Sequence, residues 1–436
     1  MKKELLGFKL KTWAWLGFLV LALIFTGKRL ALARATPNRL KFAHTMTTES
    51  EQAILREAIT EFERSHPGVV IEQIVSNSEV YNTVGWRLQF QGRNQPDIYF
   101  HWQGFKVEYC IDNGWAMDLT PFLSRGFLDQ FLPSTVVKQR GGTYFLPHSV
   151  DVCNLVWYNR QILDRLNLRE PSTLNHWLAL CRKLRDANIL ALAQGNRDLW
   201  PMGNLAMELL GKSLGPATAD TLFQPAIAIQ PRDLQGMESL TWLLTNGCFD
   251  LPGVLNPGAV GSLSDIDAKV LFLSGKSGQH ILGSWFLADI QDAQSRNELK
   301  FDIGVFGVPS QEGRSNVMAM VSTGFLVNPR TKNPRASVEF VELLLSKQYQ
   351  SAFAKLGNLS ARLDAADFTD HPLAKRMLEI RSGTLSLVPP PDTGFRPDQA
   401  AAFYDVCGKL IDKGLDSSQA AALWSREKEH LARKGL

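Results

Sequence analysis

The sequence has few cysteines and only one long hydrophobic run, and each of these two features excludes certain classes of protein. Its 436 residues include five cysteines, which are far apart and form no CxxC pair: Cys110, Cys153, Cys181, Cys248 and Cys407. This pattern excludes a dense disulfide framework and lacks the ligand spacing of a zinc site. The one long apolar run, Trp13 to Phe25, excludes a membrane protein with several spanning segments.

Internal repeats and low-complexity segments are also absent from the sequence. Hydrophobic residues make up 45% of the chain and charged residues 21%, which is the composition of an ordinary globular protein. About 400 residues follow the N-terminal segment, more than one hydrophobic core usually supports. We therefore expect two lobes.

Motifs for catalysis are missing or incomplete. The sequence has no G-x-S-x-G and no HExxH, and its eight histidines are scattered. Gly211-Lys212-Ser213 and Gly275-Lys276-Ser277 resemble the end of a phosphate-binding loop, but the required first glycine falls on Ala206 and Val270. We therefore expect a protein that is not an enzyme and has no metal and no cofactor. A glycosidase carboxylate pair is assembled in space and has no sequence signature, so a secreted glycan hydrolase remains an alternative.

The N-terminus resembles a secretory signal peptide. A basic start and a 13-residue apolar run are followed by Ala31-Leu32-Ala33, an A-x-A cleavage site. The run is shorter than the roughly 20 residues of a membrane span. We expect residues 1–33 to be removed and the protein to reach the periplasm; an uncleaved membrane anchor is the alternative, because Lys28 and Arg29 precede the site. No cysteine lies directly after the run, where a bacterial lipoprotein signal requires one; the first cysteine is Cys110.

The basic character of the chain belongs to that segment. Cleavage after Ala33 removes six basic residues and one acidic residue, which lowers the formal net charge from +4 to −1. Binding to nucleic acid phosphates requires a basic surface. Nucleic acid is therefore not an expected partner.

Hydrophobic periodicity predicts alternating strands and helices. Residues 40–44 read as a strand, and Thr48 to Glu51 form a capping box that begins a helix. His66-Pro67-Gly68 ends this helix, and strands follow at 69–75 and from Pro96. This order predicts a parallel sheet with helices on its faces.

Several short segments together resemble a known family. They are Pro67-Gly68-Val69-Val70, Pro96-Asp97-Ile98, Asn113-Gly114 with Leu119-Thr120-Pro121, Gly142-Thr143-Tyr144 with Pro147, Leu155 with Trp157-Tyr158-Asn159, Phe272 with Gly275-Lys276, Gly283-Ser284-Trp285, and Phe340 to Leu345. Their order and spacing over roughly residues 40–430 resemble the type 1 extracellular solute-binding proteins, the maltose-binding-like subunits of bacterial ABC importers. Leu174-Asn175-His176 and Ser277-Gly278 depart from the family pattern.

The resemblance implies an α/β fold of the type II periplasmic-binding-protein kind. Each of the two lobes would be a mostly parallel sheet flanked by helices, and crossover hinge strands would join the lobes near residues 148–152, 308–314 and 346–354. The N-terminal lobe would comprise residues 36–150 and 312–348, and the C-terminal lobe residues 151–311 and 349–436. Ligand would bind in the crevice between the lobes, which closes about a hinge.

Composition supports a sugar as this ligand, because nine of the eleven tryptophans lie beyond the signal segment. The C–H face of a pyranose stacks on an aromatic ring, and its hydroxyls need polar partners. The resemblance puts Trp285 at a position that often lines the cleft and Asp151 at the first crossover. Further candidates lie at strand ends and crevice loops: Thr45, His101, Trp102, His148, Asn196, Asp198, Trp200, Phe395 and Arg396.

The sequence therefore predicts a monomeric periplasmic protein that delivers an oligosaccharide or a small glycoside to the permease of an ABC importer. A charged solute, such as a glycerophosphate ester or a polyamine, is an alternative ligand for the same fold. It would call for a cluster of arginines or carboxylates in the cleft.

Overall fold

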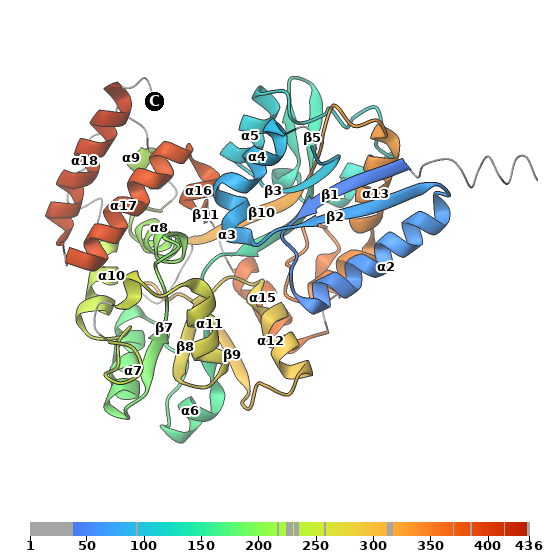
Figure 1. The fold of residues 1–436 in the computed structure, drawn as a ribbon. Helices are drawn as coiled ribbons and strands as arrows, with labels where there is room; N and C mark the ends of the chain where they lie inside the picture. The colour runs from blue at the N-terminus through green and yellow to red at the C-terminus, as the bar shows by residue number, and fades with distance from the viewer. Residues whose placement is uncertain are drawn as a thin grey trace, which may run out of the picture.

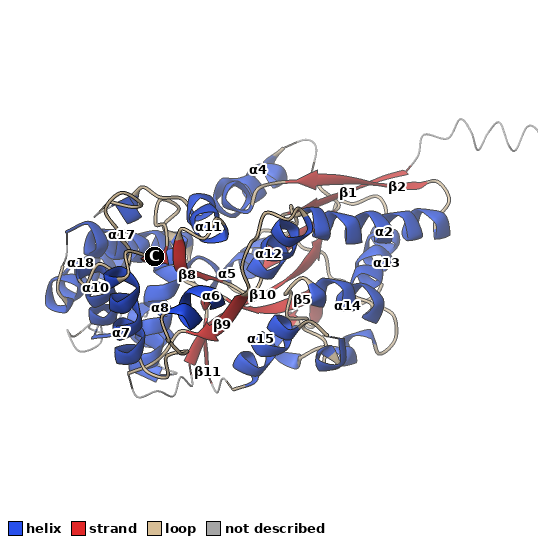
Figure 2. Ribbon diagram, turned by 90° about the horizontal axis from the view of Figure 1, so that it is seen from below, coloured by secondary structure: helices blue, strands red, loops and turns tan. Residues whose placement is uncertain are grey.

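The computed structural model describes residues 38–92, 95–215, 218–223, 230, 235–256, 259–311, 317–368, 370–383, 386–413 and 415–433. The predicted signal peptide, residues 1–33, lies outside them. Among the helices described, none is both long and apolar enough to cross a membrane. The chain forms two β-sheets with helices packed around each (Figures 1 and 2).

The larger sheet has seven strands, in the order β2-β1-β3-β10-β5-β4, with β11 paired to β10. Their bounds are β1 Asn38–His44, β2 Val69–Val75, β3 Ile98–Trp102, β4 Val137–Gln139, β5 Gly142–Val152, β10 Val317–Val327 and β11 Ser386–Val388. β1 runs parallel to β2 and β3, whereas β10 runs antiparallel to β3 and β5. This sheet and the helices packed on it are called the large-sheet half below.

The smaller sheet has four strands, in the order β7-β8-β6-β9. Their bounds are β6 Leu155–Asn159, β7 Leu190–Ala193, β8 Ser277–Leu282 and β9 Ile303–Gly307. β7 and β8 are parallel, and β6 is antiparallel to both β8 and β9. This sheet and its helices are called the small-sheet half.

Helices cover both sheets (Figure 1). Those of the large-sheet half are α2 Glu49–Ser65, α3 Ser78–Val80, α4 Trp86–Gln91, α5 Phe105–Asp112, α13 Pro334–Leu344 and α14 Lys347–Lys355. Those of the small-sheet half are α6 Arg160–Arg165, α7 Leu174–Asp186, α8 Trp200–Leu214, α9 Thr218–Phe223, α10 Gln235–Thr245, α11 Asp265–Leu273, α12 Phe286–Ser295, α15 Pro372–Ser382, α16 Pro391–Gly394, α17 Pro397–Lys413 and α18 Ser417–Arg433. The C-terminal helices α17 and α18 pack against each other and against α10, and α17 also packs against α8.

The first helix begins where its sequence signal predicts. The Thr48 hydroxyl accepts a hydrogen bond from the Glu51 backbone N–H at 3.3 Å, and the Glu51 carboxylate accepts one from the Thr48 N–H at 3.1 Å. The apolar face of α2 is buried through Leu55, Ala58 and Phe62. This reciprocal cap and apolar face fix the start of α2 beside the end of β1.

The two halves are joined where β5 leaves the larger sheet. The Val152 carbonyl at the end of β5 accepts a hydrogen bond from Ser284 of the small-sheet half at 2.9 Å. β6 begins three residues later, at Leu155, and its middle residue Trp157 is fully buried. All five cysteines are buried free thiols.

Candidate functional site

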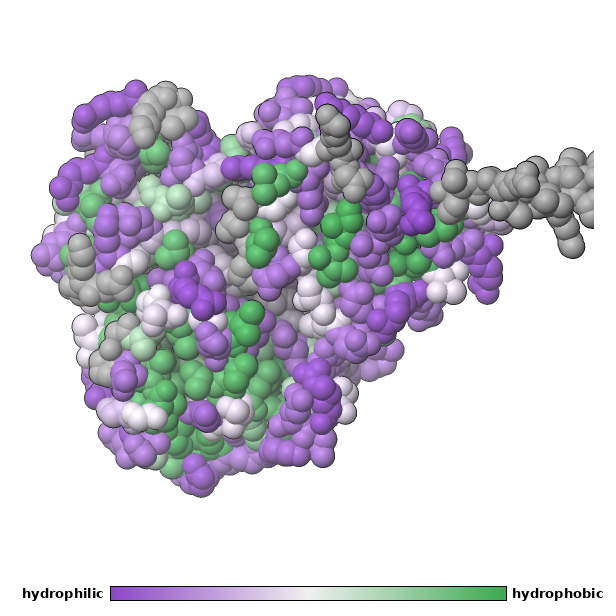
Figure 3. Space-filling model, in the orientation of Figure 1, coloured by the Kyte–Doolittle hydropathy of each residue, from purple (hydrophilic) through white to green (hydrophobic). Residues whose placement is uncertain are grey.

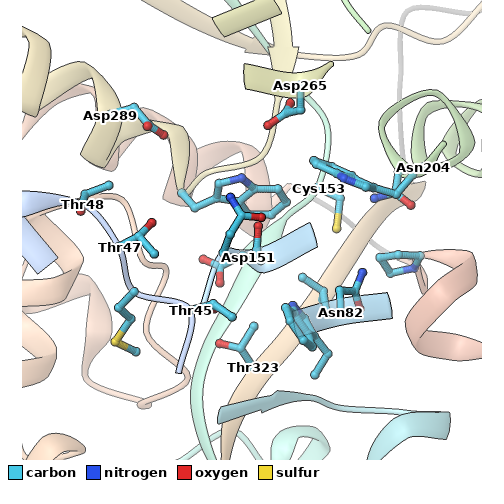
Figure 4. A pocket seen from close by; sticks show the side chains of 18 of the residues that line it. Thr45, Thr47, Thr48, Asn82, Asp151, Cys153, Asn204, Asp265, Asp289 and Thr323 are labelled. Carbon is cyan, nitrogen blue, oxygen red and sulfur yellow. The ribbon is translucent and has the colours of Figure 1, made fainter. Parts of the chain in front are cut away.

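A cleft of about 450 Å³ lies between the two halves. Its walls come from the ends of β1, β3, β5 and β10 on one side and from α8, α11 and α12 on the other. Hydroxyl and amide side chains are spread around it: Thr45, Thr47, Thr48, Asn77, Ser78, Asn82, Asn204, Thr323, Asn358 and Thr393. Figure 4 shows Thr45, Thr47 and Thr48 on one side of Asp151, and Asn204 and Asn82 on the other.

Three half-buried tryptophans line the cleft. Trp102 ends β3 in the large-sheet half, whereas Trp200 begins α8 and Trp285 precedes α12 in the small-sheet half. The rings of Trp200 and Trp285 lie 6.3 Å apart, tilted by 52°. The ammonium of Lys106 lies 4.8 Å from the Trp102 ring centre, a cation–π distance. Aromatic surfaces are therefore available on both walls.

The indole of Trp285 depends on the glycine two residues before it. A Cβ atom on Gly283 would lie 2.2 Å from ring carbons of Trp285, closer than atoms can approach. Only glycine lets the indole fold back across the backbone at this point. The pair Gly283 and Trp285 therefore sets the orientation of one aromatic wall.

The carboxylate of Asp151 connects three chain segments at the base of the cleft. It accepts hydrogen bonds from the Ser284 hydroxyl at 2.9 Å, from the Leu359 backbone N–H at 3.0 Å, and from the Ser149 hydroxyl. Burial raises the pKa of Asp151, and the hydrogen bonds and the charge of Arg381 oppose this shift. The carboxylate is 3% exposed and holds β5 against the small-sheet half.

Two carboxylates lie on either side of one lysine on the wall formed by α11 and α12. Lys269 lies 3.6 Å from an Asp265 carboxylate oxygen and 3.5 Å from one of Asp289. Glu51 also lines the cleft, from α2. Burial raises the pKa of Glu51 to about 7; hydrogen bonds from Thr48 oppose the shift and the charge of Asp289 adds to it. The wall formed by α11 and α12 therefore places two carboxylates against one ammonium group.

At one edge of the cleft, α12 contacts the beginning of α2. The Asp292 carboxylate accepts hydrogen bonds from the backbone N–H groups of Glu49 at 2.9 Å and Ser50 at 3.3 Å, and from the Ser50 hydroxyl. A carboxylate at a helix N-terminus satisfies exposed N–H groups and interacts favourably with the helix dipole. This contact joins the two halves.

At the other edge of the cleft, α5 and α16 are linked by a cluster of buried polar side chains. Lys106 lies 3.1 Å from Asp392, which also accepts hydrogen bonds from Asn82 at 2.7 Å and from the Tyr404 hydroxyl at 3.1 Å. Although burial raises the pKa of Asp392, the charge of Lys106 and these hydrogen bonds hold it below its usual value. Gly104, with φ of +110°, allows the close approach, since a Cβ there would lie 2.4 Å from the Thr393 carbonyl oxygen.

Five of the eleven predicted site residues line the cleft: Thr45, Trp102, Asp151, Trp200 and Trp285. The structure does not bring the other six to the cleft lining. His101 is fully buried next to Trp86, because successive side chains of a strand point to opposite faces and Trp102 faces the cleft. His148 is buried beside Gln350 and the edge of Phe353.

The remaining four residues have structural contacts of their own. The Asn196 backbone N–H donates to the Val260 carbonyl at 2.7 Å, and the Asp198 carboxylate accepts from the Asp265 N–H at 2.9 Å, at the start of α11. Phe395 stacks on Phe223 with ring centres 3.5 Å apart. Arg396 pairs with Asp398 at 3.2 Å.

Other residues that line the cleft were not anticipated from the sequence, notably Asn82, Asp265, Lys269, Asp289 and Asp392. Asp392 lies in the proline-rich loop of residues 387–398, which also contains the candidates Phe395 and Arg396, so the loop itself gave a signal. The other four had none, because their positions depend on how α11, α12 and the segment after β2 pack. No three His, Cys, Asp or Glu side chains among the described residues are grouped to hold a metal ion.

Comparisons with known proteins agree with this architecture. A family model described as "Bacterial extracellular solute-binding protein" matches residues 47–351. An uncharacterized ABC transporter extracellular-binding protein of Pyrococcus horikoshii is 23% identical over 67% of this chain, which spans 65% of that relative's length. A probable sugar-binding periplasmic protein of Mesorhizobium japonicum is 22% identical over 73% of this chain and 76% of its own.

Among solved structures, a chitin oligosaccharide binding protein superimposes with a TM-score of 0.76 at 20% identity, over 91% of this chain and all of that one. This likeness concerns the fold. It confirms the predicted α/β architecture of two lobes.

Proposed function

Because the chain belongs to the family of bacterial extracellular solute-binding proteins, we propose that it binds a carbohydrate outside the cytoplasm and delivers it to the permease of an ABC importer. The ligand is an oligosaccharide or a small glycoside. The sugar-binding periplasmic relative from Mesorhizobium japonicum supports this ligand class. The proposal includes export by the signal peptide at residues 1–33 and a monomeric state.

One observation carries the choice of ligand: aromatic rings on both walls of the cleft, with hydroxyl and amide groups between them. Trp102 comes from one half, and Trp200 and Trp285 from the other. A pyranose stacks its C–H face on such rings while its hydroxyls bind the polar groups. The carboxylates of Asp265 and Asp289 would repel an anionic solute such as a glycerophosphate ester.

Ligand binding works by shifting the protein between open and closed conformations. A ligand that contacts both walls only when they are close favours the closed state by its differential affinity. The contacts of α2 with α12 and of α5 with α16 support a closed arrangement in this structure. We propose the lobe division given above, with residues 36–150 and 312–348 against 151–311 and 349–436, apart from α14 and β11, which pack with the large sheet.

We further propose that no reaction takes place in the cleft. Asp151 accepts three hydrogen bonds from the protein and Lys269 lies between Asp265 and Asp289, so these groups have structural partners. Incubation with chromogenic glycosides tests this point. Release of the chromophore at a rate proportional to protein concentration would favour the hydrolase alternative.

The main test is a thermal-shift screen of the chain without residues 1–33 against sugars, polyols, sugar phosphates and polyamines. A ligand at 100 times its dissociation constant stabilises the folded state by about 2.7 kcal/mol. We expect stabilisation by neutral sugars, followed by a calorimetric titration with 1:1 stoichiometry. A response to sugar phosphates or polyamines alone would replace the carbohydrate with a charged solute.

A further inference from the structure

Helix α11 exposes a row of aliphatic side chains inside the cleft. Ile266, Val270 and Leu273 all line the cleft, and their spacing of four and three residues puts them on one face of the helix. Ile266 is 52% exposed and Val270 60% exposed. Figure 3 shows that hydrophobic side chains reach the molecular surface over α11.

Ile266 and Val270 are not needed to pack α11 against the protein, whereas the half-buried Leu273 also packs against the hydrophobic core. The opposite side of the helix is anchored by Ala268 and Phe272, which are both fully buried. A helix at the surface normally places polar residues on its solvent side. Ile266 and Val270 therefore expose apolar area that the fold itself does not cover.

A sugar ring alone does not explain these residues. Its hydroxyls gain nothing from aliphatic neighbours, and its C–H face is best matched by the flat surfaces of Trp200 and Trp285. The polar residues of α11, Asp265 and Lys269, form a separate row one position away. The cleft thus continues from an aromatic and polar region into an aliphatic one on the same wall.

We propose that the ligand is a glycoside with an apolar aglycone, and that Ile266, Val270 and Leu273 bind this aglycone. The inference rests on the proposed function, which supplies the sugar. An aglycone is the expected occupant of the aliphatic row because the row and the proposed sugar-binding residues line the same cavity. Met46 from the large-sheet half also lines the cavity, and its flexible thioether side chain adapts to apolar groups of different shape.

The test compares glycosides that differ only in the aglycone. Methyl glycosides of common hexoses and pentoses identify a sugar and anomeric configuration that bind, and the hexyl and phenyl glycosides of that sugar are then titrated by calorimetry. Complete burial of a methylene group strengthens binding about fourfold. We expect the hexyl glycoside to bind at least about tenfold more tightly than the methyl glycoside.

The double variant I266S/V270S should remove most of this gain and change the affinity for the methyl glycoside less than about twofold. The control is Leu88→Ser, which replaces an equally exposed aliphatic residue on α4, 61% exposed and outside the cleft lining. Leu88→Ser should keep the gain. Equal affinity of the wild type for methyl and hexyl glycosides, or a gain that persists in the double variant, would overturn the inference while leaving the proposed function intact.

Two further outcomes identify a different error. If no glycoside binds and the thermal-shift screen finds no sugar ligand either, the proposed function fails together with this inference; if only an oligosaccharide without an aglycone binds, this inference alone fails. If I266S/V270S leaves both affinities unchanged but lowers sugar uptake by cells, the row contacts the permease, and its assignment to the ligand is overturned.

Discussion

Lys106 and Asp392 form an ion pair of 3.1 Å between helices that belong to different halves of the molecule. Their side chains are 6% and 19% exposed, so water screens the pair only weakly. Asn82 bonds to both partners and links the pair to the cleft lining. The contact between α5 and α16 is therefore a polar connection between the halves, placed directly beside the proposed ligand.

Breaking this pair should cost far more stability than breaking an exposed one. Lys106→Met leaves the Asp392 carboxylate buried without its cation, a change that costs about 3 kcal/mol. Urea denaturation of the variant measures this loss. The control, Arg140→Met, removes an exposed pair with Asp112 and should cost less than about 1 kcal/mol. Equal losses in the two variants would mean that the Lys106 pair is no more than a surface contact.

Trp285 should contribute to ligand binding without being needed for folding. Trp285→Ala removes one aromatic wall of the cleft, and we expect sugar affinity to fall about tenfold or more in calorimetry, because stacking and buried area are lost together. Trp285→Phe should retain part of the affinity. Trp242→Ala, a change outside the cleft lining, is the control. Unchanged affinity in Trp285→Ala would remove this residue from the site.

Glu51 should make the protein less stable as the pH rises. Its pKa in the folded protein is about 7, above that of an exposed glutamate, because burial disfavours the charged form. The folded state therefore binds more protons than the unfolded state between about pH 4.5 and pH 7. Across this window the free energy of unfolding should fall by at most about 3 kcal/mol as the pH increases.

Chemical denaturation at pH 5 and pH 8 measures this effect, with Glu51→Gln as the matched variant. Glutamine keeps a hydrogen-bonding side chain at the third position of α2 but does not titrate. The difference in stability between wild type and variant should therefore depend on pH in the stated direction. A difference that stays constant from pH 5 to pH 8 would mean that Glu51 is ionised throughout.

Gly283→Ala should weaken binding through Trp285. The new methyl group would lie 2.2 Å from ring carbons, so the indole must move. We expect lower sugar affinity and a change in tryptophan fluorescence. The matched control is Gly408→Ala in α17, where a Cβ meets nothing within 4 Å and alanine favours the helix by up to about 1 kcal/mol. Affinity and fluorescence like those of wild type would show that the ring tolerates the methyl group.

The fold could be predicted because its signals are local or ordered along the chain. The capping box at Thr48 and the apolar face of α2 are visible in a few residues, and the structure has both. The short motifs that resemble solute-binding proteins occur in the right order, and the two-sheet architecture follows from them. The register of β5 and β10 could not be predicted in this way, because these paired strands lie about 170 residues apart in sequence.

The site could be predicted only in part, for reasons that involve side-chain direction and distant contacts. The end of β3 was a sound indication, but of His101 and Trp102 only the tryptophan points toward the cleft. In the proline-rich loop, Asp392 lines the cleft, whereas Phe395 stacks on Phe223. Asp151 is held by the backbone of Leu359, 208 positions later, and no local pattern encodes such a partner.

The contact of Asp292 with the first turn of α2 has a consequence for the speed of ligand exchange. Its partners are N–H groups and a hydroxyl, all of which water can bind equally well once the halves separate. Separating Asp292 from α2 therefore exchanges hydrogen bonds within the protein for hydrogen bonds with water. The contact keeps the two halves aligned, yet breaking it costs little free energy. This suits the proposed role, in which the protein binds and releases its ligand repeatedly.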